Sequence, residues 1–271
     1  MTFILQAQPF LGACVDQESP FAQNLVGCWL LNDYSLLARN IAGNVPDSPM
    51  LLNGGTGLAV VPGTTGLALS QNGSSTGGVA CSPLLGLAGA ELTVIVVAAF
   101  AASNPTSNSP LAISFGTAQG VDTEFNLGIW SNQYLWWDMG NDYTYRPIPG
   151  GFNANAPVMI GAVLQRNLTR AFYFNGLRVG GEAPAKSLYA GNGGVSLMQQ
   201  RAAQASNTSM NGMLYLAYVW TRALVPAEMA ALAAEPYLFI VPPARQGTWF
   251  KPAVTSTVCA GAYRLSIGVG M

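Results

Sequence analysis

The sequence predicts an all-β antiparallel sandwich that carries one short helix near its C-terminal end and an extended arm at each terminus. From Leu25 onward, short apolar or alternating runs are separated by turns rich in Gly, Asn, Ser and Pro, which is typical of a sandwich or barrel. A single segment carries helix signals, and no internal repeat divides the chain. We therefore expect one domain over residues 25–240, an N-terminal arm over 1–24 and a C-terminal arm over 241–271.

The candidate strands combine β-branched and aromatic residues with flanking turn residues. Residues 92–102, LTVIVVAAFAA, are too few to span a bilayer, so we expect a strand that is buried on both faces. The whole set of candidate strands is 25–31, 66–70, 79–81, 92–99, 111–115, 124–130, 134–138, 158–166, 170–174, 195–198 and 213–220.

A hairpin and a helix are the most specific local predictions. Asn175-Gly176 lies between two apolar runs, and this dipeptide adopts the positive φ angles of a tight hairpin turn. Pro226 suits the first position of a helix, because its missing N–H would have no helical partner there. Glu228 then places a carboxylate in the first turn, and the helix ends before Pro236.

The charge balance limits the classes of function. Charged residues make up 8% of the 271-residue chain, against roughly 25% in average soluble domains. With 11 basic and 12 acidic residues, the chain lacks the basic patch that nucleic-acid binding requires. Few charges favour a surface that neighbouring proteins cover, with the arms added as strands to adjacent subunits. We expect no nucleic-acid partner and no membrane insertion.

The absence of histidine restricts catalysis and metal binding. Without it, Ser-His-Asp and Cys-His catalysis and the usual zinc and iron centres are excluded. Glycoside hydrolysis uses a pair of carboxylates. In a strand-like segment the chain offers one such pair, Asp122 and Glu124, and the alternation of a strand would place both on one face. We interpret this pair as the solvated start of a strand, and expect no catalytic residue, no cofactor and no metal site.

Four cysteines are dispersed along the chain, at Cys14, Cys28, Cys81 and Cys259, without a Cys-x-x-Cys pair. This dispersion favours free, buried thiols. One or two disulfides is the alternative.

A span rich in aromatic and amide side chains, residues 128–151, is the candidate binding surface. Sugar rings stack on aromatic faces while Asn and Asp side chains hydrogen-bond their hydroxyl groups, so the span predicts a glycan site. The candidate residues are Trp130, Tyr134, Trp136, Trp137, Asp138, Asn141, Tyr143 and Tyr145.

Two other roles are open to the same residues. Trp130 and one of Trp136 and Trp137 could fill the core of the sandwich. Neighbouring residues of a strand point to opposite faces, so these two tryptophans should lie on different sides of the sheet. The exposed one could equally lie at a subunit interface, where Trp and Tyr are enriched.

Five segments occur in an order that is known from one family. They are NLVGCWLLNDYSLLARNIAGN (24–44), GLALSQNGSSTGGV (66–79), ELTVIVVAAF (91–100), VMIGAVLQRNLTRAFYFNGLRVG (158–180) and GMLYLAYVWTRALVPAEMAAL (212–232). The order resembles the concanavalin A-like, laminin-G-type jelly rolls, especially the copies in phage and prophage virion proteins. The segment EPYLF (235–239) is similar to the aromatic-proline segment that follows the helix in phage versions.

The resemblance implies a jelly-roll sandwich. The positions at which this chain departs from the family pattern bear on function. The family's helix usually begins with a Ser cap, where this chain has Val225. Glucanases of this class carry a Glu-x-Asp-x-x-Glu motif, and the segment around Asp122 and Glu124 lacks its additional acid. Gln71-Asn72 replaces the Asp of a Phe-Asp-Gly turn. With few carboxylates near the loops, a calcium site is not expected.

We therefore expect a non-enzymatic phage virion structural protein, a capsid decoration or a tail or fibre component, located in the virion. Its partners would be other virion proteins, further copies of itself in a homo-oligomer such as a trimer, and host surface glycans. A carbohydrate-binding adhesin or lectin outside a virion is the alternative, and a glycoside hydrolase ranks third.

Overall fold

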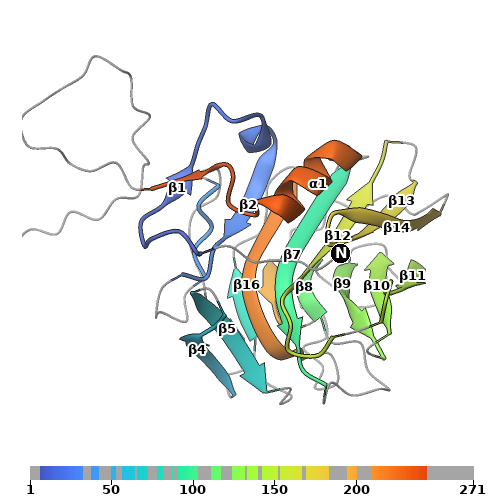
Figure 1. Cartoon of the computed structure of the whole chain (residues 1–271), viewed down its shortest axis with the longest axis horizontal. Coiled ribbons are helices and arrows are strands. Elements are labelled where there is room, and N and C mark those ends of the chain that lie inside the picture. Colours follow the sequence, from blue (N-terminus) through green and yellow to red (C-terminus); the bar gives the residue numbers. More distant parts are fainter. Residues whose placement is uncertain are drawn as a thin grey trace, which may run out of the picture.

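The structure is a computed structural model in which two antiparallel sheets lie face to face (Figure 1). This arrangement confirms the predicted antiparallel β-sandwich with one short helix. None of the described helices is long and apolar enough to cross a membrane. The structure describes residues 7–32, 38–42, 50–52, 57–64, 66–72, 78–81, 87, 91–102, 111–116, 124–131, 133–139, 142–151, 153–166, 169–182, 194–199 and 209–242.

The first sheet has seven strands in the order β11-β10-β9-β8-β15-β6-β3. These are β3 (Met50–Leu52), β6 (Gly78–Cys81), β8 (Leu111–Gly116), β9 (Glu124–Trp130), β10 (Tyr134–Met139), β11 (Asp142–Pro147) and β15 (Val195–Leu197).

The second sheet has eight strands in the order β14-β13-β12-β7-β16-β5-β4, with β2 paired to β16 off this path. These are β2 (Leu25–Trp29), β4 (Leu58–Pro62), β5 (Leu67–Asn72), β7 (Leu92–Phe100), β12 (Val158–Leu164), β13 (Arg170–Phe174), β14 (Leu177–Glu182) and β16 (Asn211–Trp220).

Every strand that the sequence predicts is present, and β9 and β13 have the predicted bounds. The hairpin turn between β13 and β14 is also confirmed, with φ angles of 48° at Asn175 and 79° at Gly176. The structure adds strands that the sequence did not indicate, namely β3, β4, β11 and the two-residue strands β1 (Cys14–Val15) and β17 (Ile240–Val241).

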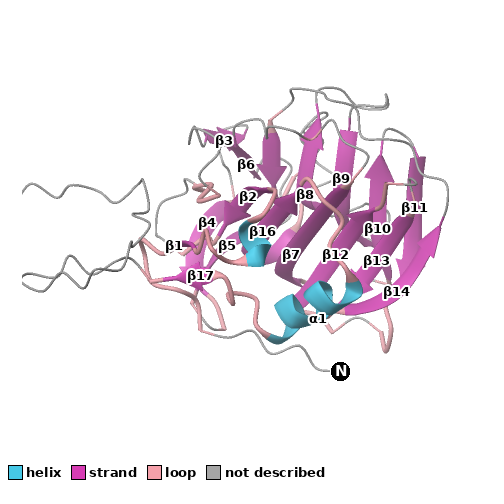
Figure 2. Cartoon of the chain, turned by 90° about the horizontal axis from the view of Figure 1, so that it is seen from above, coloured by secondary structure: helices cyan, strands magenta, loops and turns pink. Residues whose placement is uncertain are grey.

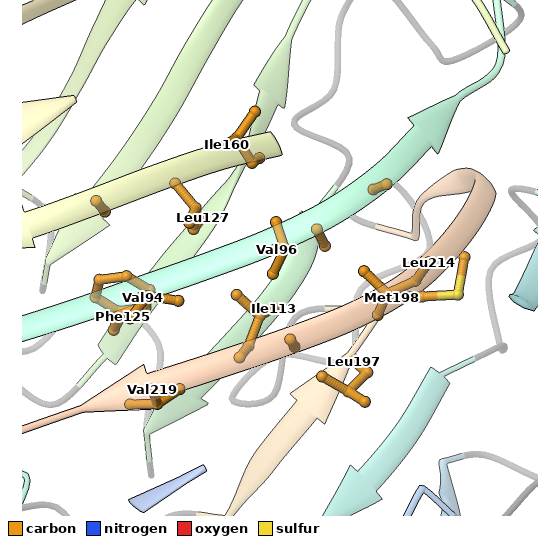
Figure 3. Packing of buried hydrophobic residues seen from close by; sticks show 14 of the residues in the cluster. Val94, Val96, Ile113, Phe125, Leu127, Ile160, Leu197, Met198, Leu214 and Val219 are labelled. Carbon is orange, nitrogen blue, oxygen red and sulfur yellow. The ribbon is translucent and has the colours of Figure 1, made fainter. Parts of the chain in front are cut away.

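Strand β7 is buried along its whole length, as expected for a strand with both faces covered. Val94 and Val96 face the seven-stranded sheet, where they join a core with Ile113 and Phe125 (Figure 3). Ile95 and its alternating neighbours on the opposite face join a second hydrophobic cluster. Because both faces are apolar, the run shows no alternation of apolar and polar residues.

An outer layer makes this second cluster by covering the free face of the eight-stranded sheet. It consists of residues 7–24, helix α1 (Pro226–Ala234) and the segment 235–242, and α1 lies against that sheet (Figure 2). A Cβ atom added to Gly161 in β12 would lie 2.6 Å from Met229 Cε of α1, so the helix packs directly on the strand.

Residues 7–24, expected to form an arm along adjacent subunits, pack instead on their own domain. Strand β1 pairs with β17, and the ring of Phe21 stacks on Phe239 with centroids 5.8 Å apart. The Trp220 indole nitrogen donates a hydrogen bond of 2.7 Å to the Phe21 carbonyl. Apolar side chains in this segment explain its docking. The remaining arm residues, 1–6 and 243–271, lie outside the described residues.

Helix α1 begins at Pro226, as predicted, but its cap is unusual. Val225 at the N-cap has no oxygen in its side chain, and it makes no side-chain capping bond. The Glu228 carboxylate accepts instead from the Val225 amide at 2.9 Å and from Arg222 at 2.8 and 2.9 Å. Burial raises the pKa of Glu228, but these hydrogen bonds outweigh burial and hold the pKa below its usual value.

The cysteines only partly follow the expectation of free thiols. Cys28 is free and buried, and burial raises the pKa of its thiol. Cys14 is disulfide-bonded, so the expectation is wrong at this position. Spacing along a sequence does not show which cysteines meet in space. Cys259 and the side chain of Cys81 lie outside the described residues.

Replacing Val225 by Ser supplies the missing capping acceptor. Val225 is 54% exposed and has the extended backbone of an N-cap, with φ −79° and ψ 159°, so the Ser hydroxyl can accept a hydrogen bond from the first turn. We expect the free energy of unfolding to rise by about 0.5–1 kcal/mol, measured by urea denaturation. Val225→Ala controls for loss of the exposed side chain. A Ser variant no more stable than the Ala variant contradicts this account of the cap.

Candidate functional site

Strand β10 distributes the predicted site residues over two faces of the seven-stranded sheet. Trp137 is fully buried between the sheets, together with Leu135. Tyr134, Trp136 and Asp138 alternate with them and lie on the outer face. The prediction that the two adjacent tryptophans point to opposite sides is confirmed. Trp137 belongs to the core, so its candidacy as a ligand-binding residue is corrected here.

The strand register brings residues of β9, β10 and β11 together on this outer face. Side chains directly opposite each other on antiparallel strands are close neighbours. The neighbours, in the order β9, β10, β11, are Trp130-Tyr134-Pro147, Gly128-Trp136-Tyr145 and Asn126-Asp138-Tyr143. We define the aromatic face as Trp130, Tyr134, Trp136, Tyr143 and Tyr145.

Three rings of the aromatic face pack against one another. The Trp130 centroid lies 5.7 Å from that of Tyr134 and 5.2 Å from that of Tyr145, and the two tyrosine centroids are 5.5 Å apart. Such contacts contribute about 0.5–1.5 kcal/mol beyond area burial. Tyr145 nevertheless stays 43% exposed, and Tyr143 is 63% exposed. Mutual packing thus orients rings that still present surface to solvent.

A polar pair lies beside these rings. Asp138 and Asn126 are both buried, and the Asn126 Nδ2 atom donates to Asp138 Oδ2 across 3.4 Å. The exposed ring of Tyr143 is the cross-strand neighbour of Asp138. Sequence reasoning missed Asn126, although the two-residue period of β9, counted back from Trp130, places it on the outer face.

The remaining predicted residues are Tyr143, Tyr145 and Asn141. Tyr143 and Tyr145 come from β11, a strand that the sequence did not indicate, because Thr144 and Arg146 at its inward positions are polar. Asn141 lies outside the described residues.

Polar contacts across the sandwich hold β11 from its inner side. The Arg170 side chain of β13 is 2% exposed. Its Nη1 atom donates to the Asp142 carbonyl at 2.6 Å, and its Nη2 atom donates to Asp142 Oδ1 at 3.0 Å. Arg170 also forms an ion pair with Glu182 of β14. Its guanidinium lies 5.7 Å from the ring centroid of Trp137.

A second set of contacts joins the same two strand edges. Arg146 of β11 donates to Glu182 Oε2 at 2.9 Å and to the Thr144 hydroxyl at 3.1 Å. The Thr144 hydroxyl donates to Glu182 Oε2 at 2.7 Å. We define the edge clip as Arg170, Asp142, Glu182, Thr144 and Arg146. It connects the edge strand of the seven-stranded sheet with β13 and β14 of the other sheet.

Among the described residues, no group of three or more His, Cys, Asp or Glu side chains is placed to hold a metal ion. Asp122 and the side chain of Glu124 lie outside the described residues. The interpretation of this pair as a solvated strand start therefore stays a prediction.

No family model and no curated protein matches the sequence. Domain 4 of AbnA, a GH43 extracellular arabinanase from Geobacillus stearothermophilus in complex with arabinotriose, has a TM-score of 0.60 at 16% identity, covering 78% of this chain and 98% of that chain. Trypanosoma rangeli sialidase in complex with sialic acid has a TM-score of 0.60 at 14% identity, covering 80% and 33%. The binding domain of Paraclostridial Mosquitocidal Protein 1 has a TM-score of 0.59 at 13% identity, covering 79% and 53%.

At these identities the similarity shows the fold, because one sandwich architecture carries many functions. This chain spans about half of the mosquitocidal binding domain structure and about a third of the sialidase. The comparisons support the β-sandwich part of the family resemblance. The phage part of that resemblance stays a prediction.

The two adjacent tryptophans should differ sharply in their effect on stability. Trp137→Ala removes a fully buried ring between the sheets, so we expect the free energy of unfolding to fall by about 3–5 kcal/mol. Trp136→Ala removes a partly exposed ring, and we expect a loss of about 1 kcal/mol or less. Urea denaturation measures both. Equal losses would contradict the assignment of the two rings to opposite faces.

Proposed function

We propose that the chain is a non-catalytic carbohydrate-binding module whose ligand surface is the aromatic face. The observation that carries the proposal is the cluster of partly exposed rings on one sheet face. The C–H faces of sugar rings pack on aromatic rings, and tyrosine hydroxyls can exchange hydrogen bonds with sugar hydroxyls.

The rigidity of this surface also supports glycan binding. Trp130, Tyr134 and Tyr145 stand on hydrogen-bonded strands and pack on each other, so little of their side-chain entropy is lost when a ligand is bound. A sugar that lies on an open sheet face makes only a small contact area. Rings that are already held in place make binding through such a small area possible, because less entropy is lost. The structures with arabinotriose and with sialic acid belong to proteins that share the sandwich fold, and they support a carbohydrate ligand by analogy of fold.

A role without catalysis fits the buried Asp138 behind this face and Asp142 on the inner side of β11. Glycoside hydrolysis generally uses two carboxyl groups that flank the scissile bond. Asp138 is bonded to the amide of Asn126, and the neighbouring Asp142 is held in the edge clip by Arg170. Ligand binding is thus the activity that these residues support best.

The glycan proposal predicts a loss of binding when exposed rings are removed. Tyr143→Ala deletes a ring that is 63% exposed beside Asp138, and we expect affinity for the glycans that bind on an array to fall about three- to tenfold. Phe10→Ala is the matched control, because Phe10 is 80% exposed and belongs to the outer layer of the other sheet. Array signals that Tyr143→Ala leaves unchanged, or that Phe10→Ala also removes, contradict the proposed surface.

For the setting of this activity we propose a phage virion, as a capsid decoration or as a tail or fibre component. The low charge content supports burial of much of the surface against neighbouring proteins, including further copies of the chain. Because residues 7–24 pack on their own domain, attachment to neighbours falls to the C-terminal arm. A lectin or adhesin outside a virion is the alternative.

Deletion of residues 243–271 tests this setting. We expect the shortened protein to disappear from purified particles, as measured by mass spectrometry, while its glycan-array signals persist because β9, β10 and β11, which carry the aromatic face, are all retained. The full-length protein in the same particle preparation is the control. If the full-length protein is absent from particles, the virion setting is excluded and the lectin alternative is favoured.

A further inference from the structure

We propose that the edge clip is the device that positions the ligand surface, with Arg170 as its central positioning residue. The inference rests on the proposed function, because the surface in question is the aromatic face. It goes further in assigning a role to side chains between the sheets, on the opposite side of β11 from any ligand.

The position of β11 makes such a device necessary. Strand β11 is the last strand of its sheet and pairs only with β10 among the described strands. An edge strand is held by one ladder of hydrogen bonds, so it opens more readily than a central strand. Yet β11 carries Tyr143 and Tyr145, the two most exposed rings of the aromatic face.

Alternation along β11 couples the clip directly to these rings. Tyr143 and Tyr145 point outward, whereas Thr144 and Arg146 point toward the other sheet and contact Glu182. A slip of β11 by one residue would exchange the two sets and turn the tyrosines inward. The inner contacts therefore determine which side chains a ligand meets.

The chemistry of Arg170 suits the fixing of register. Its planar fork binds both the carbonyl and the carboxylate of Asp142, the first residue of β11, and it pairs with Glu182 as well. Directional bonds of this kind have one good geometry, whereas apolar side chains pack almost equally well after a slip. Buried ion pairs often contribute little net stability but can specify one arrangement.

A double variant of the clip separates its effect on strand position from its effect on stability. In the double variant Arg170→Met/Glu182→Met, apolar side chains of similar length replace the buried Arg170 and the partly exposed Glu182. We expect its urea midpoint to stay close to that of the unmodified protein, because the partners left behind, Asp142 and Arg146, are 30% and 26% exposed and regain hydration. We expect amide hydrogen exchange at Tyr143 and Tyr145 to accelerate, and signals on the glycan array to fall by about tenfold.

Two further variants sharpen the comparison. Arg222→Met/Glu228→Met is the matched control, because it replaces another ion pair, at the start of α1 in the outer layer, and should leave exchange at β11 and array signals unchanged. Arg170→Lys keeps the charge and loses the planar fork, so we expect faster exchange at β11 and intermediate array signals. If the double variant does not fold, Arg170→Lys carries the test.

Two outcomes would overturn the positioning role. Exchange at β11 as slow as in the unmodified protein means that the clip does not hold the strand, and unchanged array signals despite faster exchange mean that its position does not matter to the ligand. If the unmodified protein gives no array signal, the proposed function fails, and exchange confined to β11 in the variants still decides whether the clip positions the aromatic face.

Discussion

Hydrophobic burial on both faces of β7 and β16 is the constraint on which the rest of the structure depends. Val94 and Val219 face the core between the sheets, whereas Ile95 and Trp220 face the outer layer. Burial contributes about 25 cal/mol for each Å² of apolar surface, so each face of these strands requires a partner layer. The outer layer uses α1 and both ends of the described chain for one face. The outer face of β9–β11, on the opposite side of the sandwich, is thereby left to carry the aromatic face.

The aromatic face combines two requirements that conflict in most sheets. Exposed rings are useful to a ligand only if they are held still, and edge strands are the least restrained strands of a sheet. Packing of Trp130 on Tyr134 and Tyr145 restrains the rings from above. Contacts of Arg170 with Asp142 restrain the strand from below. The polar edge clip between the sheets is thus explained by the aromatic face on the outer side of the same strand.

Much of this architecture follows from the sequence, and the exceptions have physical causes. Continuous apolar runs identify β7, and the Asn175-Gly176 turn and Pro226 identify the hairpin and the helix. Strand β11 was missed because its inward positions, Thr144 and Arg146, are satisfied by Glu182 from a distant strand. Alternation predicted that two adjacent tryptophans face opposite ways, but it does not say which is buried. Asn126 joins the site only through the register of β9 with β10.

The central claim, that the outer face of β9–β11 binds carbohydrate, is tested most directly by hydrogen-exchange footprinting with and without arabinotriose and with a mixture of array-positive glycans. The account predicts slower exchange over residues 124–147 in the presence of a bound glycan, with no change in α1 or in residues 7–24. Slower exchange confined to the outer layer, or no change for any glycan that the protein binds, would contradict it.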